Sequence, residues 1–148
     1  MAATAFILYN LAKKKMANGT IDLDTNIWRA ALATSASNAS TATLGVYGSV
    51  TGEVTTGNGY TTGGKSLTTI TWTVGASATE YRFDAADLVW TATGGNIANV
   101  KFMVIRNSTA AASGDLLCWT RLSSAQFTLT SGNTLTVQFS ANGIFELN

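Results

Sequence analysis

The sequence predicts a mainly β protein, an antiparallel β-sandwich of about eight or nine strands with one N-terminal α-helix. From residue 69 onward, segments that alternate apolar and polar residues follow one another at intervals of roughly 8–12 residues, separated by Gly, Asn, Asp and Ser turns. Only one segment, at the start of the chain, has apolar residues spaced by three and four. A length of 148 residues suits one domain covering 1–148, large enough to bury a core.

The helix is predicted over about residues 3–17, which contain no Gly or Pro. Lysines at 13–15 lie near its end, where cations interact favourably with the helix dipole. Asn18-Gly19 then supplies a left-handed stop. The helix packs either on the core of its own domain or, as an arm, on a neighbouring subunit. The second alternative rests on four consecutive residues that cover more than one helix face, Phe6, Ile7, Leu8 and Tyr9.

A strand is expected over 26–34, followed by a mobile surface loop of small polar residues over 35–43. Residues 44–47 form a short strand or a turn. The glycine- and threonine-rich stretch 51–64 is expected to be a loop with several tight turns.

Later segments have the period of two that half-buried strands require. In residues 69–74, Ile70, Trp72 and Val74 alternate with threonines. Residues 100–105 are apolar on both faces except at Lys101, which predicts a central strand covered on each side. Further strands are expected at 80–84, 88–90, 116–122, 127–130, 135–139 and 144–147.

Charge is scarce, at 11% of residues and a net formal charge of +1. Without His the chain has no Ser-His-Asp triad and no His-ligated metal, and its single Cys forms no internal disulfide. The charge balance gives no electrostatic footprint for nucleic acid. The apolar run 2–12 is too short to span a membrane and lacks the basic start of a secretory signal. A weakly charged surface tends to associate with other proteins.

Few residues suggest chemistry. Asp22 and Asp24 are spaced to share a hard cation, but Asp beside a turn more often caps the backbone. Gly64-Lys65-Ser66 lacks the earlier glycine and the following helix of a phosphate-binding loop. No carboxylate pair stands out, so we expect no enzyme, no metal and no cofactor.

Aromatic residues offer a different possibility, a platform for sugars. Most of them fall on the apolar phase of their strands, so core packing is the favoured interpretation. Tyr47 and Tyr60 lie in the glycine-rich region and are the two expected to be partly exposed. They are therefore candidates for contacts with a glycan or with another protein.

Three segments carry a family resemblance. These are Glu53-Val54 with Gly57-x-Gly59-Tyr60-Thr61-x-Gly63-Gly64, then Phe83-Asp84-Ala85-Ala86-Asp87-Leu88-Val89-Trp90, then Asn142-Gly143-Ile144-Phe145-Glu146-Leu147. These segments follow the predicted N-terminal helix and the strand at 26–34. In this order they resemble a family of small structural proteins encoded by tailed bacteriophages. The chain departs from the family after Thr34, where other members place acidic and aromatic residues.

The resemblance implies a non-enzymatic virion component with a β-sandwich-like body. The preferred role is capsid decoration or cement, on the outside of the head after assembly in the host cytoplasm. The alternative is a tail- or fibre-associated protein, or a host-glycan-binding module. The implied partners are copies of the same chain, as in a trimer, and the major capsid protein, with no nucleic acid and no membrane. The candidate interface residues are Phe6, Ile7, Leu8, Tyr9, Tyr47 and Tyr60.

Overall fold

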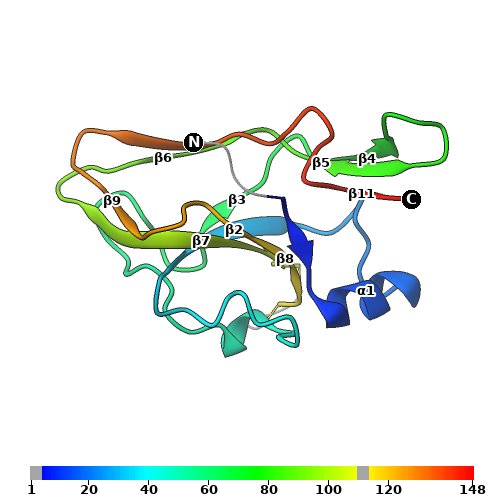
Figure 1. Cartoon of the computed structure of the whole chain (residues 1–148), viewed down its shortest axis with the longest axis horizontal. Helices are drawn as coiled ribbons and strands as arrows, with labels where there is room; N and C mark the ends of the chain where they lie inside the picture. The colour runs from blue at the N-terminus through cyan, green and yellow to red at the C-terminus, as the bar shows by residue number, and fades with distance from the viewer. Residues whose placement is uncertain (1–4, 110–113) are drawn as a thin grey trace.

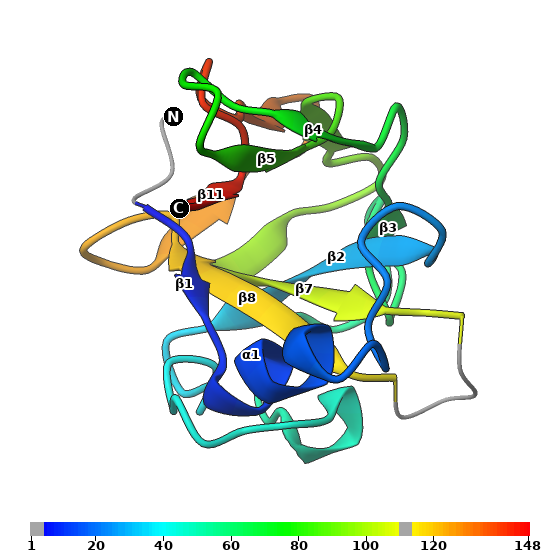
Figure 2. The same cartoon turned by 90° about the vertical axis from the view of Figure 1, so that its right-hand side faces the viewer.

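A computed structural model describes residues 5–109 and 114–148 and shows a mainly β protein with antiparallel strands and one α-helix. The predicted fold class is confirmed. A six-stranded sheet lies in the middle of the molecule, with smaller sheets above it and a helix with an irregular segment below it (Figure 1). The view turned by 90° shows the same layers (Figure 2).

The central sheet has the strand order β1-β8-β7-β2-β3, and a sixth strand, β9, pairs with the first part of β7. Neighbouring strands are antiparallel throughout. Its members are β1 (Ile7–Leu8), β2 (Trp28–Thr34), β3 (Lys65–Ser66), β7 (Ile97–Asn107), β8 (Leu116–Arg121) and β9 (Phe127–Leu129).

Strand β7 is the central strand that the sequence predicts. Val100, Met103, Val104 and Ile105 are fully buried, although successive side chains point to opposite faces of the sheet. Both faces of β7 are therefore covered. The apolar run 100–105 forms a strand there because no side of it needs to be polar.

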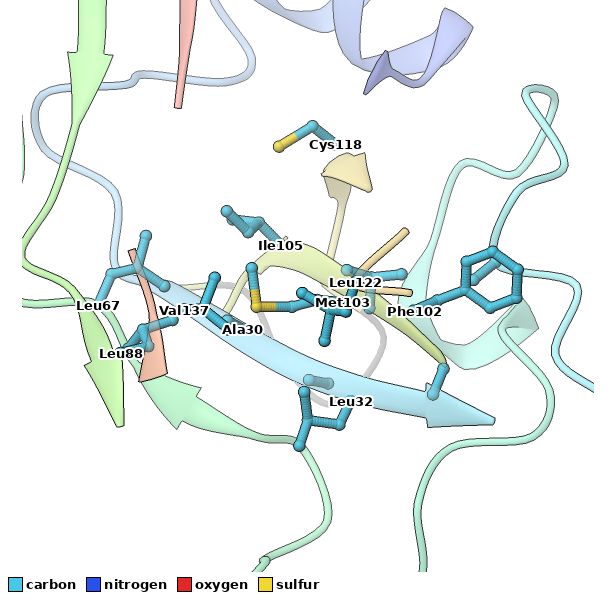
Figure 3. Close-up of a cluster of buried hydrophobic side chains, with 14 of the residues drawn as sticks. Ala30, Leu32, Leu67, Leu88, Phe102, Met103, Ile105, Cys118, Leu122 and Val137 are labelled. Carbon is cyan, nitrogen blue, oxygen red and sulfur yellow. The ribbon is translucent and has the colours of Figure 1, made fainter. Parts of the chain in front are cut away.

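The upper layer contains two small sheets. One is three-stranded, in the order β11-β5-β4, and the other pairs β10 with β6. Leu67, Leu88 and Val137 gather beside Ala30 of the central sheet (Figure 3). The strands of this layer are β4 (Thr71–Val74), β5 (Tyr81–Asp84), β6 (Leu88–Thr91), β10 (Thr134–Val137) and β11 (Phe145–Leu147).

The N-terminal helix begins later than predicted. Residues 3 and 4 lie outside the described part of the chain, but Ile7–Leu8 form β1, paired with Trp119 and Cys118, and helix α1 covers Asn10–Ala17. Backbone pairing with the sheet edge outweighs the helical spacing of residues 6–9. Tyr9 is the extended residue at the helix start, and its hydroxyl donates to the carbonyl of Ala39. The predicted stop is correct, since Gly19 has a φ of +75°.

The segment 35–50 covers the lower face of the sheet beside α1 (Figures 1 and 2). It is less of a surface loop than expected, because Ala39 is fully buried. The Asn38 side chain accepts from the backbone N–H of Thr51 and donates to the carbonyl of Ser49, which ties the two ends together. Residues 44–47 turn into a short 3₁₀ helix over Tyr47–Ser49.

Candidate functional site

The three-stranded sheet carries the most continuous exposed apolar feature among the described residues. Because β4, β5 and β11 are antiparallel and in register, apolar residues form two parallel rows across one face of the sheet. The inner row is Trp72, Phe83 and Phe145, and the outer row is Val74, Tyr81 and Leu147.

The two rows differ sharply in burial. In the inner row Phe83 is completely buried, Phe145 is 9% exposed and Trp72 is half-buried. In the outer row Val74 is 50%, Tyr81 47% and Leu147 37% exposed. The three-stranded sheet therefore extends past the edge of the core. The face that packs on the core in the inner row is exposed to solvent in the outer row.

A groove of about 310 Å³ adjoins this exposed row. Leu147 and Trp72 form one wall, and the end of α1 with the segment after it forms the other. The Trp72 ring lies 5.5 Å from the Tyr81 ring, so the apolar surface is continuous from the groove to the outer row. The residues lining the groove are Met16, Gly19, Ile21, Asp22, Leu23, Trp72 and Leu147.

Strand β4 is also the edge of its sheet. Its four residues, Thr71–Val74, include no charged residue and no proline. Charged residues and prolines usually protect an exposed edge strand against pairing with another strand, so β4 lacks this protection. The outer row ends on this edge at Val74, where an added strand would extend both the sheet and the apolar face.

The Gly-rich motif fastens its own loop to the central sheet. One oxygen of Glu53 accepts hydrogen bonds from the Tyr60 hydroxyl at 2.7 Å and from the backbone N–H of Gly63 at 2.6 Å. The Tyr60 hydroxyl in turn accepts from the N–H of Leu32 at 3.1 Å. These bonds fasten the stretch 51–64 to β2. They explain why the motif needs its glutamate and its tyrosine at this spacing.

Burial shifts the pKa of several titratable groups. Burial raises the pKa of Tyr9 and of Tyr47 above the ordinary value. Burial raises the pKa of Tyr60 as well, and its hydrogen bond to the Glu53 carboxylate adds to the increase. Burial also raises the pKa of the Cys118 thiol, which keeps it protonated and unreactive at neutral pH.

The second motif, 83–90, has a structural role too. Phe83 and Trp90 lie in the core. The Asp84 carboxylate accepts from the N–H of Ala85 at 2.8 Å, and that of Asp87 accepts from the N–H of Phe139 at 3.0 Å. The two aspartates therefore terminate the turn between β5 and β6 and anchor a distant segment beside it.

The candidate cation pair is a backbone cap, as the sequence favours. Asp22 accepts from the N–H groups of Asp24 and Thr25 at 3.0 and 3.2 Å. A hydrogen bond from the Thr25 side chain and these backbone bonds lower the pKa of Asp22. Within 5–109 and 114–148, no three His, Cys, Asp or Glu side chains gather as a metal site would require. Lys65 lies in a strand instead of opening a helix.

The six predicted interface residues do not form one surface. Tyr9 and Tyr60 are buried, so the expected exposure of Tyr60 is wrong: its hydroxyl is needed inside, between Glu53 and β2. Tyr47 is half-buried beneath the guanidinium of Arg106, 4.3 Å from the ring centre. Phe6 and Leu8 are half-buried, with Phe6 packed on Phe139, whereas Ile7 is 47% exposed.

The outer row is absent from the sequence prediction. Alternation assigns Val74 and Tyr81 to the apolar phase and hence to the core, because the pattern carries no information on where the opposite layer ends. The one signal of their exposure in the sequence is their position beside the turn 75–80, at the end of the hairpin formed by β4 and β5.

No family model, curated protein or solved structure matches this chain. Helix α1 is the single α-helix of the described residues, and none there is long and apolar enough to cross a membrane.

Proposed function

We propose that the chain is a non-enzymatic structural protein of a tailed-bacteriophage particle, and that it acts as a capsid decoration or cement protein. The resemblance of the motifs at 53–64, 83–90 and 142–147 supports the phage assignment. The observation that carries the structural role is the outer row, Val74, Tyr81 and Leu147, which continues a core face into solvent.

The occupant of the outer row is a second copy of this chain. An antiparallel edge can pair with its own copy about a two-fold axis, since the same donors and acceptors then face each other. Pairing of two β4 strands joins the two three-stranded sheets into one. It also brings Val74 of each copy beside the apolar face of the other.

The mechanism of a cement protein is bridging. An oligomer that contacts more than one capsid subunit stabilises the assembled shell over its free subunits, because it binds the assembled state alone. The surface suits such contacts. Thr, Ser, Asn and Gly dominate it, and small neutral side chains lose little hydration energy when another protein covers them.

The abundance of the chain in purified particles tests this function. We expect quantitative mass spectrometry of virions to find it at a level comparable to that of the major capsid protein. A level far below that of the capsid protein would instead assign it to the tail or to fibres. Its absence from purified particles would overturn the virion assignment altogether.

The oligomeric interface has its own test. In light scattering coupled to size-exclusion chromatography, the wild-type chain is expected to run as an oligomer that Val74→Lys dissociates. The matched control is Val89→Lys, since Val89 is 38% exposed but lies on β6, outside the outer row. A wild-type monomer at high concentration, or equal effects of the two lysines, would exclude this interface.

A further inference from the structure

The backbone of β4 presents its free hydrogen-bonding groups in a fixed pattern. Gly75, the residue after β4, donates its N–H across the hairpin to the carbonyl of Glu80 at 2.8 Å. Backbone groups alternate between the two sides of a strand, so those of Thr73 also point to β5. The N–H and C=O groups of Trp72 and Val74 therefore point to the side where β4 has no neighbouring strand in the described structure.

This alternation limits how two β4 strands can pair. In an antiparallel pair, a residue whose backbone groups point outward lies opposite another residue of the same kind. A two-fold axis must therefore pass through a residue position and not between two positions. Three axes, at Trp72, Thr73 or Val74, place an outward residue of one β4 strand opposite an outward residue of the other.

The axis at Thr73 is the one that uses both outward residues of each copy. It sets Trp72 opposite Val74 of the other copy, twice, which allows four backbone hydrogen bonds. An axis at Val74 sets Trp72 opposite Ala76, whose N–H already donates to a carboxylate of β11 at 3.4 Å. An axis at Trp72 sets Val74 opposite Ile70, which lies outside β4 and follows a residue with a φ of +52°.

The side chains agree with the axis at Thr73. On the apolar face, Trp72 then lies beside Val74 of the other copy, so each inner row continues into the outer row of the other copy. An aromatic residue opposite a β-branched one is a favourable cross-strand pair. On the other face Thr73 lies opposite itself, which is also a favourable pair. Each exposed outer row thus becomes part of an apolar row that crosses the whole joined sheet.

Charge favours a second copy as the occupant of this edge. About a two-fold axis each charge comes close to its own equivalent, so a charged edge strand repels its copy. The four residues of β4 carry no charge. The opposite edge of the same sheet, β11, carries Glu146 at its centre. Pairing through β4 therefore uses the uncharged edge and leaves the charged one, so that assembly through this sheet stops at two copies.

We propose that two copies of the chain form a closed dimer in which β4 pairs with β4 about a two-fold axis at Thr73. This inference rests on the β4 pairing of the proposed function and specifies its register and its number of copies. Two copies replace the trimer that the phage resemblance suggests. The register does not depend on whether the dimer decorates a capsid.

Disulfide formation at the axis measures the register. Two Thr73 residues that face each other lie in a pair without hydrogen bonds, with Cα atoms about 4.5 Å apart. A disulfide spans Cα separations of about 4.4–6.8 Å. Under mild oxidation with glutathione, the full chain carrying Thr73→Cys is therefore expected to convert mostly to a covalent dimer. Denaturing gels run with and without reductant measure the fraction that is linked.

Two controls accompany this variant. Thr71→Cys changes the same residue type on the same face of the same strand. With the axis at Thr73, the two Thr71 residues lie about 14 Å apart, too far for a disulfide. The wild-type chain is the second control, because its single Cys118 is fully buried. Neither control is expected to form a covalent dimer.

The possible results separate the register from the interface itself. If Val74→Lys dissociates the oligomer but Thr71→Cys links as fast as Thr73→Cys, or neither links, the register is wrong and β4 pairing stands. Light scattering that finds the linked Thr73→Cys dimer within a trimer or a larger oligomer would overturn closure at two copies. A monomer in every sample, without cross-linking, would overturn the register together with the β4 pairing on which it rests.

Discussion

Strands β7 and β4 both carry apolar side chains, but these are covered to different extents. Strand β7 is covered on both faces, and its residues from Met103 to Ile105 are fully buried. Strand β4 alternates apolar residues with threonine, yet Val74 at its end is half exposed. A strand pattern thus determines which side chains share a face, while the extent of the opposite layer determines whether that face is covered.

The largest effect is expected when a substitution in the inner row is compared with one in the outer row. Phe83→Ala is expected to lower the free energy of unfolding by about 3–5 kcal/mol, because the ring is fully buried and contacts Trp28 and Phe145. Val74→Ala, two residues from the inner row, is expected to cost less than about 1 kcal/mol. Urea denaturation at low protein concentration measures both. Similar losses would mean that the outer row is covered after all.

The second test concerns a close approach inside the central sheet. Gly64 has a φ of +75°, and a Cβ there would lie 1.9 Å from the carbonyl oxygen of Ala30. Gly64→Ala is expected to cost about 2–4 kcal/mol, since left-handed strain adds to a clash with backbone that cannot move freely. Gly132 is the control, with a φ of +88° and no atom near its Cβ position. Gly132→Ala is expected to cost about 1–2 kcal/mol from strain alone, and an equal cost at Gly64 would contradict the close approach.

Much of the fold is predictable from local pattern. The antiparallel β class, the buried strand at 100–105, the turn at Asn18-Gly19 and the capping role of Asp22 follow from periodicity and turn chemistry, which act over a few residues. The helix start does not follow. Residues 6–9 satisfy a helical spacing as well as a strand, and the choice is made by the edge of β8, more than a hundred residues away.

The candidate surfaces are harder to predict for the same reason. Tyr60 follows a glycine in a polar loop, where exposure is the ordinary expectation. Its burial depends on Glu53 and on the backbone of Leu32, which the loop brings together only in the folded chain. The outer row likewise combines residues of β4 and β5 with Leu147 of β11, which lies far from them in sequence.

A third test examines the bonds that hold the glycine-rich loop to the sheet. The Glu53 carboxylate accepts hydrogen bonds from both Tyr60 and Gly63. Glu53→Gln keeps the shape of the side chain but replaces this charged acceptor with a neutral one. We expect a loss of about 1–3 kcal/mol in the free energy of unfolding, since bonds to a charged group are the stronger kind. Thr55→Ser, in the same stretch but exposed, serves as the control. An unchanged stability of Glu53→Gln would show that the loop is held by its glycine turns alone.

The smallest effect is expected for a Val→Thr substitution in β4. The same substitution in β7 allows a direct comparison of the two strands. Val74→Thr on β4 is expected to change the free energy of unfolding by less than about 0.5 kcal/mol, because the added hydroxyl faces water and threonine suits a strand. Val104→Thr makes the same substitution in β7, where the hydroxyl is buried, and is expected to cost about 1–3 kcal/mol. Repeating both measurements over a range of protein concentrations separates two kinds of cover. A cost at Val74 that grows with concentration indicates that a second copy covers the outer row, as the proposed β4 pairing requires. A cost at Val74 equal to that at Val104 and independent of concentration would mean that the chain covers the row by itself, which would leave β4 no free apolar edge to offer.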